Sequence, residues 1–556
     1  MDSAELLALA KRRGILFPAY EIYGGLRGFY EYGPLGARLK ENILSVWRRY
    51  YVLGEGFLEI ESPSISPEEV FRASGHLEEF TDILVQCNKC GEQYRADHLL
   101  TEHPNPDSLT IGEIKKLLGN VRCEKCGGEI GAPELFNLMF STTVGAGSGG
   151  RKAYLRPETA QGMFVNFSLL YRFAREKMPF GVVQVGRGFR NEISPRQGVI
   201  RLREFNMAEA EVFIDPRDKS WPRFKYVAGD KLRLVPENGT EVEVAAKEAV
   251  QQKIIGSESL AYFIAITKRF LLDIGIDVER VRFRRHLEGE QAHYAQECWD
   301  AEVATSLGWI ECVGIADRGT YDLSRHIEFS GSELKAFRPF KEARVREVVN
   351  IVPNMSVLGR LYRSKAKEIA RKLSEMETIK EPVVVKVEGE YISLSPECYS
   401  IEKRVERVQG EKYIPAVIEP SYGIDRIIYA LLEHSAREKE GRICLRLKPH
   451  IAPIFVGVFP LMPKDGLDER ARRIDENLRN AGFHTFYDES GSIGRRYARM
   501  DEIGTPFCIT VDYDTLKDGT VTIRERETSE QVRVGETSLV KRLRELMHGL
   551  PFHSLK

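Results

Sequence analysis

Two strand-like segments at 180–192 and 199–213 constrain the fold most, because they carry charged residues within otherwise apolar sequence. The link between them, ISPRQG at 193–198, contains a proline and a glycine that favour a turn. A buried charge costs free energy unless it is paired or meets a charged ligand. This hairpin is therefore predicted to form one wall of a polar site.

Alternation of side chains across a strand places the charges of the hairpin in two groups. Arg190 and Glu192 share one face of the first strand, and Arg201, Arg203 and Glu209 share one face of the second. Guanidinium groups suit phosphate, and carboxylates suit an ammonium or amino group. A surface hairpin held by cross-strand ion pairs would show the same pattern, so the pattern alone leaves both interpretations open.

The remaining pattern indicates several domains, as the length of 556 residues also suggests. Apolar residues at helical spacing predict an amphipathic helix at 35–53, followed by a short strand that ends at Pro63. Asn238-Gly239 marks the turn of a hairpin at 231–246, and a helix at about 259–274 follows.

The C-terminal part has a different order of strands and helices. From Pro449 onward, the apolar segments PIFVGVF, HTFY and PFCITV alternate with helices expected at about 467–481 and 493–503, before two more strands and a last helix. A βαβαβ alternation is typical of a mixed α/β domain. We therefore expect a separate domain at 449–556.

Composition narrows the class of protein. The formal net charge of -1 argues against a general polyanion binder, although local basic runs occur at 280–285 and 364–372. The sequence has no apolar run of about 18 residues and no secretory signal, so we expect no membrane segment. Nine cysteines in so long a chain do not make a disulfide scaffold, and a reducing, cytoplasmic location is expected.

Four of the cysteines form two CxxC pairs. Cys87 and Cys90 belong to CNKC, and Cys123 and Cys126 belong to CEKC. Four thiolates suit a tetrahedral zinc ion, and a site filled by four protein ligands leaves no position for chemistry. Structural zinc is therefore predicted, with a disulfide or a degenerate site as the alternative.

Several stretches together resemble one family. The segment GFRNEISPRQGVIRLREFNMAE at 188–209 resembles motif 2 of class II aminoacyl-tRNA synthetases in its glycyl-tRNA synthetase form. LRPETAQG at 155–162, GWIECVGIADRGTYDL at 308–323 and the motif 3 segment VIEPSYGIDRIIYALLEH at 417–434 agree in order and spacing. The helix at 35–53 resembles motif 1, the dimerisation element of the class, and the C-terminal domain resembles an anticodon-binding domain.

The resemblance implies an α+β fold. An antiparallel-sheet catalytic domain would span 1–448, with a mixed α/β anticodon-binding domain at 449–556. Insertions in the catalytic domain are expected at about 87–126, which would bind zinc, about 214–290 and about 340–410.

The resemblance also implies a reaction. Glycine would attack the α-phosphate of ATP, which is bound with Mg²⁺, and pyrophosphate would leave. Glycine would then pass to the 3′ end of tRNA(Gly). The family is dimeric, and the apolar face of the helix at 35–53 is expected to pair two copies. Three basic residues of the C-terminal domain, Arg495, Arg496 and Arg499, would be candidate contacts to tRNA phosphates.

Site residues carry over from the family by position. Arg190 and Arg426 would be catalytic, the first at the α-phosphate and the second at the far end of the triphosphate. The ATP site would comprise Arg190, Asn191, Glu192, Arg201, Leu202, Glu311, Cys312 and Arg426, with Glu311 acting through magnesium. The glycine site would comprise Arg95, Glu158, Glu209, Glu419, Pro420 and Ser421.

Particular residues of the sequence argue against three other interpretations. His76 and His98 are expected to be hydrogen-bonding partners, because a carboxylate nucleophile is already ionised and needs no general base. A non-catalytic nucleic-acid binder similar to a polymerase accessory subunit would have no reason to keep Arg190, Glu192 or Arg426. A synthetase for threonine, serine or proline is disfavoured by the pocket glutamates and the EPSYG segment.

Overall fold

A computed structural model gives the structure of the chain in two compact units, one formed by 1–334 and 415–556 and the other by 335–414. The residues it describes are 3–100, 103, 109–195, 198–287, 294–374, 376, 382–387, 389–439 and 441–555. Arg196 and Gln197, in the predicted turn between the two strand-like segments, lie outside the described residues. Within the described part, no helix is long and apolar enough to cross a membrane.

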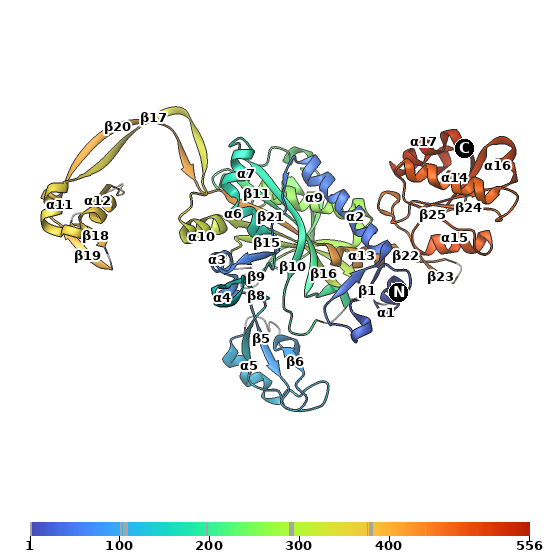
Figure 1. Ribbon diagram of the computed structural model, residues 1–556, viewed down its shortest axis with the longest axis horizontal. Coiled ribbons are helices and arrows are strands. Elements are labelled where there is room, and N and C mark those ends of the chain that lie inside the picture. The colour runs from blue at the N-terminus through green and yellow to red at the C-terminus, as the bar shows by residue number, and fades with distance from the viewer. Residues whose placement is uncertain are drawn as a thin grey trace. The chain divides into compact units, whose positions relative to one another are not determined.

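A nine-stranded sheet forms the centre of the larger unit, with the order β13-β12-β14-β15-β16-β21-β11-β10-β3. Its strands β10, β11, β15, β16 and β21 are labelled in Figure 1. Its strands are β3 (Leu58–Glu59), β10 (Phe180–Phe189), β11 (Glu204–Ile214), β12 (Lys231–Val235), β13 (Val242–Ala245), β14 (Val281–Arg285), β15 (Glu297–Thr305), β16 (Gly308–Gly319) and β21 (Ala416–Gly423). Neighbouring strands are antiparallel, apart from the parallel pairs β3–β10 and β12–β14. The predicted antiparallel-sheet domain is therefore confirmed.

The charged hairpin is present, but its strands are shorter than predicted. Phe189 on β10 pairs with Glu204 on β11, so residues 190–203 form a long connection outside the ladder. The alternation argument therefore does not apply to Arg190, Glu192, Arg201 and Arg203. A hydrogen bond from the Arg190 amide to the Arg203 carbonyl, 2.9 Å, brings the two ends of the connection together instead.

Strand alternation does hold for β11 itself. Ala208, Ala210 and Val212 join the large apolar core, whereas Glu209 and Glu211 face the other side of the sheet. The core therefore lies on one face of the sheet, and the polar site lies on the opposite face.

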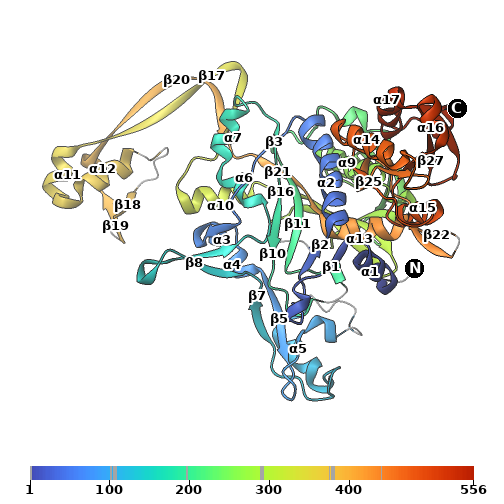
Figure 2. The ribbon, with the colours of Figure 1, turned by 45° about the vertical axis from the view of Figure 1, so that its right-hand side comes forward.

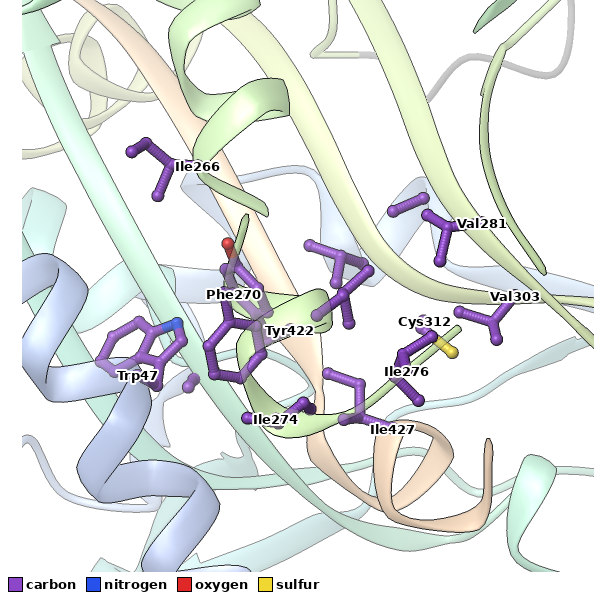
Figure 3. Packing of buried hydrophobic residues seen from close by; sticks show 14 of the residues in the cluster. Trp47, Ile266, Phe270, Ile274, Ile276, Val281, Val303, Cys312, Tyr422 and Ile427 are labelled. Carbon is purple, nitrogen blue, oxygen red and sulfur yellow. The ribbon is translucent and has the colours of Figure 1, made fainter. Parts of the chain in front are cut away.

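Helices cover the apolar face of the sheet. They are α2 (Pro34–Arg48), which continues as a π-helix over Arg49–Gly54, α9 (Glu258–Ile274) and α13 (Ile424–Ser435). Figure 2 labels α2, α9 and β21 in the ribbon, and α9 contacts both of the others. Trp47, Phe270 and Tyr422 come together there from these three elements (Figure 3). Ring centroids of Phe270 and Tyr422 lie 5.3 Å apart in an edge-on arrangement, which is favourable for aromatic pairs.

The helix predicted at 35–53 is present, but its apolar face packs into the core of its own chain, whereas we expected it to pair with a second copy. Leu39, Ile43 and Trp47 are at most 1% exposed and belong to the core of their own chain. This face is therefore not available to a second copy.

Two of the expected insertions differ in structure. The segment at about 214–290 supplies β12, β13 and β14 to the central sheet, and its helix α9 lies in the main core, so it is continuous with the catalytic domain. The insertion expected at about 87–126 is larger in the structure, because only β6 (Gln93–Arg95) of its small sheet β6-β5-β7 lies within those bounds. The other two strands are β5 (Thr81–Gln86) and β7 (Glu134–Asn137).

The smaller unit overlaps the third expected insertion. Two long paired strands, β17 (Ala336–Pro353) and β20 (Tyr399–Tyr413), connect to the helices α11 (Met355–Tyr362) and α12 (Ala366–Ser374) and to the hairpin of β18 (Val383–Val387) and β19 (Glu390–Leu394). Leu358, Ile369, Leu373 and Val385 form part of a separate apolar core in this unit.

The C-terminal domain is a mixed five-stranded sheet with the order β25-β24-β26-β27-β28. The strands are β24 (Val456–Pro460), β25 (Thr485–Tyr487), β26 (Phe507–Val511), β27 (Thr520–Glu525) and β28 (Gln531–Gly535), and the helices are α14 (Leu467–Asn480), α15 (Ile493–Glu502), α16 (Tyr513–Asp518) and α17 (Glu536–Met547). The predicted βαβαβ order is confirmed, and the short helix α16 is an addition to it. Ile451 and Ala452, beyond the boundary expected at 448, pack into the central core.

The N-terminal segment is fixed to parts of the chain that come much later in sequence. The Tyr32 hydroxyl donates a hydrogen bond to Asp425 on α13, and Arg13 forms an ion pair with Glu502 on α15. Asn42 Nδ2 donates to the carbonyls of Ile451 and Ala452 at 3.2 and 3.0 Å. Residues 3–48 are thus an integral part of the larger unit.

Candidate active site

A cavity of about 260 Å³ opens on the polar face of the central sheet. Its walls come from β11, β15, β16, β21, the start of α13 and the connection 190–203. Of the predicted site residues, the lining includes Glu158, Arg190, Glu192, Arg201, Leu202, Glu209, Glu311, Cys312, Glu419, Ser421 and Arg426.

Arg190 is the first residue after β10 and lies at the cavity wall. Its Nε donates to the Pro157 carbonyl at 3.3 Å, and its guanidinium lies over the rings of Phe80 and Phe205, with 5.2 and 5.3 Å to the centroids. Aromatic rings on two sides hold the group without consuming all of its donors. Arg190 is therefore oriented and still able to bind an anion.

Arg203 fixes the path of the connection that carries Glu192. Its Nε and Nη2 donate to the Glu192 carbonyl at 3.0 and 2.7 Å. The buried Oε2 atom of Glu192 has no hydrogen-bond partner among the described residues. A buried acceptor without a partner is costly, so this carboxylate is suited to a ligand that donates a hydrogen bond.

Two further residues of the connection, Arg201 and Asn191, are each held by a hydrogen bond to another part of the chain. Arg201 Nη1 lies 2.9 Å from His98 Nε2, which confirms the prediction that His98 is a hydrogen-bonding partner. Burial, together with the neighbouring Arg95, lowers the pKa of Arg201. The Asn191 amide donates to the Leu138 carbonyl at 2.7 Å, which anchors the backbone at this point.

Arg426 and Glu311 form a pair across the cavity mouth. Arg426 Nη1 donates to Glu311 Oε2 at 3.1 Å and to the Glu311 carbonyl at 2.9 Å, while Nε donates to the Ile200 carbonyl at 2.9 Å. Burial disfavours ionisation of Glu311, but the Arg426 guanidinium outweighs it and lowers the pKa of this carboxyl. Glu311 is therefore an anion that faces the cavity.

Cys312 is oriented differently from its neighbour. Its side chain is 2% exposed and lies in the apolar core among Val303, Ile276 and Ile427 (Figure 3). Burial raises the pKa of its thiol to about 12. A ligand in the cavity would therefore meet the backbone of Cys312, and the thiol serves packing.

Three buried carboxylates gather at the inner end of the cavity. Glu209 accepts from the Ser421 hydroxyl at 2.6 Å and from the Thr159 amide at 2.6 Å, and the Thr159 hydroxyl donates to the same carboxylate. Glu158 accepts from Gln161 Nε2 at 2.8 Å, and its Oε2 lies 3.5 Å from His76 Nε2. Although burial opposes ionisation, His76 and Arg318 hold the pKa of Glu158 far below its usual range.

Arg318 holds the third carboxylate, that of Glu419, and this role was not predicted from the sequence. Its Nη1 donates to Glu419 at 2.9 Å, and its Nε and Nη2 donate to the two oxygens of Asp322, each at 2.7 Å. The guanidinium lies 3.6 Å from the centroid of the Tyr294 ring. Arg318 lies on β16 and Asp322 on α10 (Tyr321–Ser330), so the rule for residues four apart on one helix does not apply and the sequence held no regular signal for this pair.

Two predicted glycine-site residues lie apart from the carboxylates. Arg95 Nε and Nη2 donate to Asp97 at 2.9 Å, Nη1 is 3.3 Å from Asp82, and the residue does not line the cavity. Pro420 lies between Glu419 and Ser421 on β21, and strand alternation takes it out of the cavity lining. Their proposed contacts with glycine remain predictions.

A second polar group at the cavity wall was not predicted. His286 Nε2 lies 2.8 Å from Asp300 Oδ2, and Arg284 lies 3.3 Å from the same oxygen. Burial and the nearby Glu311 raise the pKa of Asp300 to about 6, against the opposing effect of His286. Nothing in the local sequence distinguishes these residues from an ordinary strand pair.

The four predicted zinc ligands come together in the segment at 87–126. Their sulfur atoms all lie within 4.8 Å of one another, with Cys87–Cys126 at 3.5 Å and Cys90–Cys123 at 3.6 Å. Zinc–sulfur bonds of about 2.3 Å in a tetrahedron place sulfur atoms roughly 3.8 Å apart, so the donor set fits zinc.

The site as a whole offers guanidiniums and an anion at its mouth and a set of buried carboxylates at its inner end. Such an arrangement can bind a polyphosphate beside a small ammonium compound. On an antiparallel sheet it defines a class II tRNA synthetase. The family model of the tRNA synthetase class II core domain (G, H, P, S and T) matches residues 146–435, and that of the anticodon-binding domain matches 455–546.

Similarity to known proteins extends over nearly the whole chain. A glycine–tRNA ligase of Methanothrix thermoacetophila is 51% identical over 99% of this chain and 98% of its own length. Those of Methanocaldococcus jannaschii and Archaeoglobus fulgidus are each 50% identical, over 97% and 99% of this chain and 98% of their own lengths. The chain therefore belongs to the glycine–tRNA ligase family.

Proposed function

We propose that this chain is a glycine–tRNA ligase that activates glycine with ATP and then transfers it to the 3′ end of tRNA(Gly). The observation that carries the proposal is the single cavity in which Arg190 and Arg426 lie near a buried set of glutamates. A cationic wall for the triphosphate and an anionic end for an ammonium are what the first reaction requires.

The phosphate roles follow from the orientation of the guanidiniums. Arg190, held between two rings, would bind the α-phosphate as negative charge develops during attack by the glycine carboxylate. Arg201 and Arg426 would bind the rest of the triphosphate, and the Oε2 of Glu192, which accepts no hydrogen bond among the described residues, would accept from the adenine amino group. Positioning of the reactants supplies most of the rate enhancement.

The amino-acid role belongs to the inner end of the cavity. Glu158, Glu209 and Glu419 would surround the ammonium, with Ser421 holding Glu209 in place. Arg318 and Asp322 make the wall rigid, because they are fully hydrogen bonded to each other. A larger amino acid would have to displace these buried groups, and a steric clash is an effective means of rejection.

Mg²⁺ with ATP fits the anionic mouth of the cavity. Glu311 faces the cavity as a carboxylate, and Mg²⁺ prefers oxygen ligands. When bound, the ion neutralises charge on the phosphates. Glu311 would hold it, and Arg426 orients Glu311 through their hydrogen bond.

Structural zinc is proposed for Cys87, Cys90, Cys123 and Cys126. The distances between their sulfur atoms support it, and four protein thiolates complete the coordination. The ion would stabilise the segment that carries β5 and β6, and through it the position of Arg95.

Contact with tRNA is proposed for the C-terminal domain, but one of its predicted phosphate contacts has to be revised. Arg496 is 1% exposed and donates to the carbonyls of Pro460, Asp488 and Leu461. It therefore supports the fold of the domain. Arg495 and Arg499 border a second cavity and remain candidates.

A cytoplasmic homodimer completes the proposal. All nine cysteines are free of disulfides, which fits a reducing compartment. Since the apolar face of α2 is buried in its own chain, the loop at 20–26 is a better candidate for the dimer contact, because Ile22 and Tyr23 are 88% and 84% exposed. Changing both to Asp should convert the dimer to monomer in sedimentation velocity, whereas an unchanged dimer would exclude this loop from the interface.

The function is tested by pyrophosphate exchange into ATP with each of the twenty amino acids. Exchange is expected with glycine and not with alanine or serine, because the buried glutamates and Arg318 leave no space for a side chain. Charging of tRNA(Gly) transcripts should follow the same specificity. Comparable exchange with alanine would contradict the assignment to glycine.

A further inference from the structure

Glu211 is a buried carboxyl group for which the proposed function gives no role. It is 0% exposed and lies two residues beyond Glu209 on the same face of β11. Neither carboxyl oxygen has a hydrogen-bond partner among the described residues, and Glu211 does not line the cavity. It therefore cannot contact substrate directly, yet it lies directly behind the glycine pocket.

The strand register places Glu211 beside Glu419. On β21, Ser421 pairs with Glu209 and Ile418 pairs with Val212, which brings Glu419 opposite Glu211 between these two pairs. On the other side of β11, Glu211 faces the apolar Val182 of β10. Like charges directly opposite each other on neighbouring strands repel, and burial strengthens the repulsion.

Among the described residues, the positive charges near Glu211 and Glu419 are fewer than the buried carboxyl groups. Within the part of the chain that the structure describes, the buried acids are Glu158, Glu209, Glu211, Glu419 and Asp322, and the groups near them that can carry positive charge are Arg156, Arg318, His76 and His326. Burial lowers the pKa of His326, so it is neutral above pH 7. Even with His76 charged, the described part of the site sets five acids against three cations, a balance that favours a proton on at least one acid in the free enzyme.

The pKa shifts agree with this charge count. Burial raises the pKa of Glu419 to about 8, although Arg318 opposes the shift. Burial and Glu419 together raise the pKa of Glu211 well above its usual range. Of the two groups, only Glu419 lines the cavity and can meet a substrate ammonium.

We propose that Glu211 and Glu419 share protons as a carboxyl pair, and that a glycine ammonium binding at Glu419 displaces one proton from this pair to solvent. The step is an exchange of charge in which the O–H bond of one carboxyl group breaks, the proton goes to water, and the ammonium pairs with the resulting carboxylate. Glu211 is a positioning residue in this scheme, because it acts only through Glu419. The inference rests on the proposed glycine site.

The test is the pH dependence of the KM for glycine in pyrophosphate exchange, from about pH 6 to about pH 8.5. Release of one proton on binding means that KM should fall by about tenfold per pH unit up to the pKa of the pair and become constant above it. The KM for ATP should show no such dependence, because ATP does not meet the pair. A KM for glycine that stays constant over this range would overturn the proposal, and this measurement needs no variant.

Glu211→Gln separates the proposed pair from a purely structural role. Without a like charge opposite it, Glu419 should ionise more readily, so the inflection in KM should move to lower pH by about one unit or more. Glu204→Gln, the same change at the partly buried start of β11, where the side chain pairs with Arg187 away from the carboxylates, should leave the inflection in place. An inflection that does not move in folded Glu211→Gln protein would overturn the role of Glu211. Absence of any glycine-dependent exchange in the wild type would instead contradict the proposed function.

Discussion

At the scale of single residues, the site depends on groups that are held by neighbours and still have capacity for a ligand. Arg190 is the clearest case, since two aromatic rings and one carbonyl fix its guanidinium. Glu209 is similar, because Ser421 and Thr159 hold it at the inner end of the cavity. Rigid placement of this kind lowers the cost of reorganising the site during reaction.

Arg190→Ala should lower kcat for pyrophosphate exchange by about 100- to 1000-fold, as the removal of one charge-stabilising group does in other enzymes. The free energy of unfolding should change by only about 1 kcal/mol, from the lost ring contacts. Both are measured on purified protein, by exchange kinetics and by urea unfolding. Arg187→Ala, near the end of β10 that precedes Arg190 but 60% exposed and paired with Glu204, is the control and should keep its activity. An unfolded Arg190 variant would indicate a structural ion pair instead.

Residue types and spacing predicted which side chains line the cavity better than they predicted what holds those side chains. Glu158, Glu209 and Glu419 were predicted because each lies in a stretch that resembles the family. Arg318 was missed, since its partners Asp322 and Glu419 come from α10 (Tyr321–Ser330) and β21, and only the three-dimensional structure brings them together. Cys312 was placed in the ATP site because it follows Glu311 in a stretch that resembles the family, but its thiol lies in the apolar core at a bulge of β16.

At the scale of secondary-structure elements, the strongly periodic segments were predicted well and the connections were not. The helix predicted at 259–274 is α9, Glu258–Ile274, because its apolar spacing is regular. The end of β10 was placed too late in the sequence and the start of β11 too early, since Glu192 and Arg203 lie outside the ladder and are joined by hydrogen bonds from the Arg203 side chain to the Glu192 carbonyl. Side-chain hydrogen bonds of this kind leave no periodic signal in the sequence.

Zinc binding would fix the structure of one segment, because a single ion would hold its two CxxC turns together. Metal analysis should find one zinc per chain in the wild type and none in Cys90→Ser, and proteolysis of the variant within 87–126 should be faster. Cys444→Ser, at a buried cysteine outside the cluster, should keep its zinc. Wild-type protein prepared without chelator that contains no metal, with all four thiols reactive, would contradict the site.

At the scale of the whole molecule, the catalytic domain holds the cavity proposed for the reaction, and the C-terminal domain is proposed to bind tRNA. The cavity is built from elements that end with α13, whereas the β24–β28 sheet has its own core of residues such as Val456, Ile509 and Ile523. Arg526 connects the two, because its Nη2 donates to the Leu447 carbonyl at 2.8 Å.

A chain ending at residue 453 should keep most glycine-dependent pyrophosphate exchange and lose most tRNA charging, since activation needs only the cavity. The cut is placed there because Ile451 and Ala452 belong to the central core, and a cut at 448 should give a less stable protein in thermal unfolding. Charging by the 1–453 protein as fast as by the full chain would contradict the assignment of the C-terminal domain to tRNA.

The attachment of the N-terminal segment has a consequence for how the protein is made. A ribosome produces α2 early, but the partners of this segment at α13, Ile451 and Glu502 emerge hundreds of residues later. Until then the core that Leu39, Ile43 and Trp47 enter is incomplete, and exposed apolar surface on a nascent chain promotes aggregation. Folding of the catalytic domain is therefore completed late in translation. Chaperones that bind exposed apolar segments should affect the yield of folded protein more than the activity of the folded enzyme.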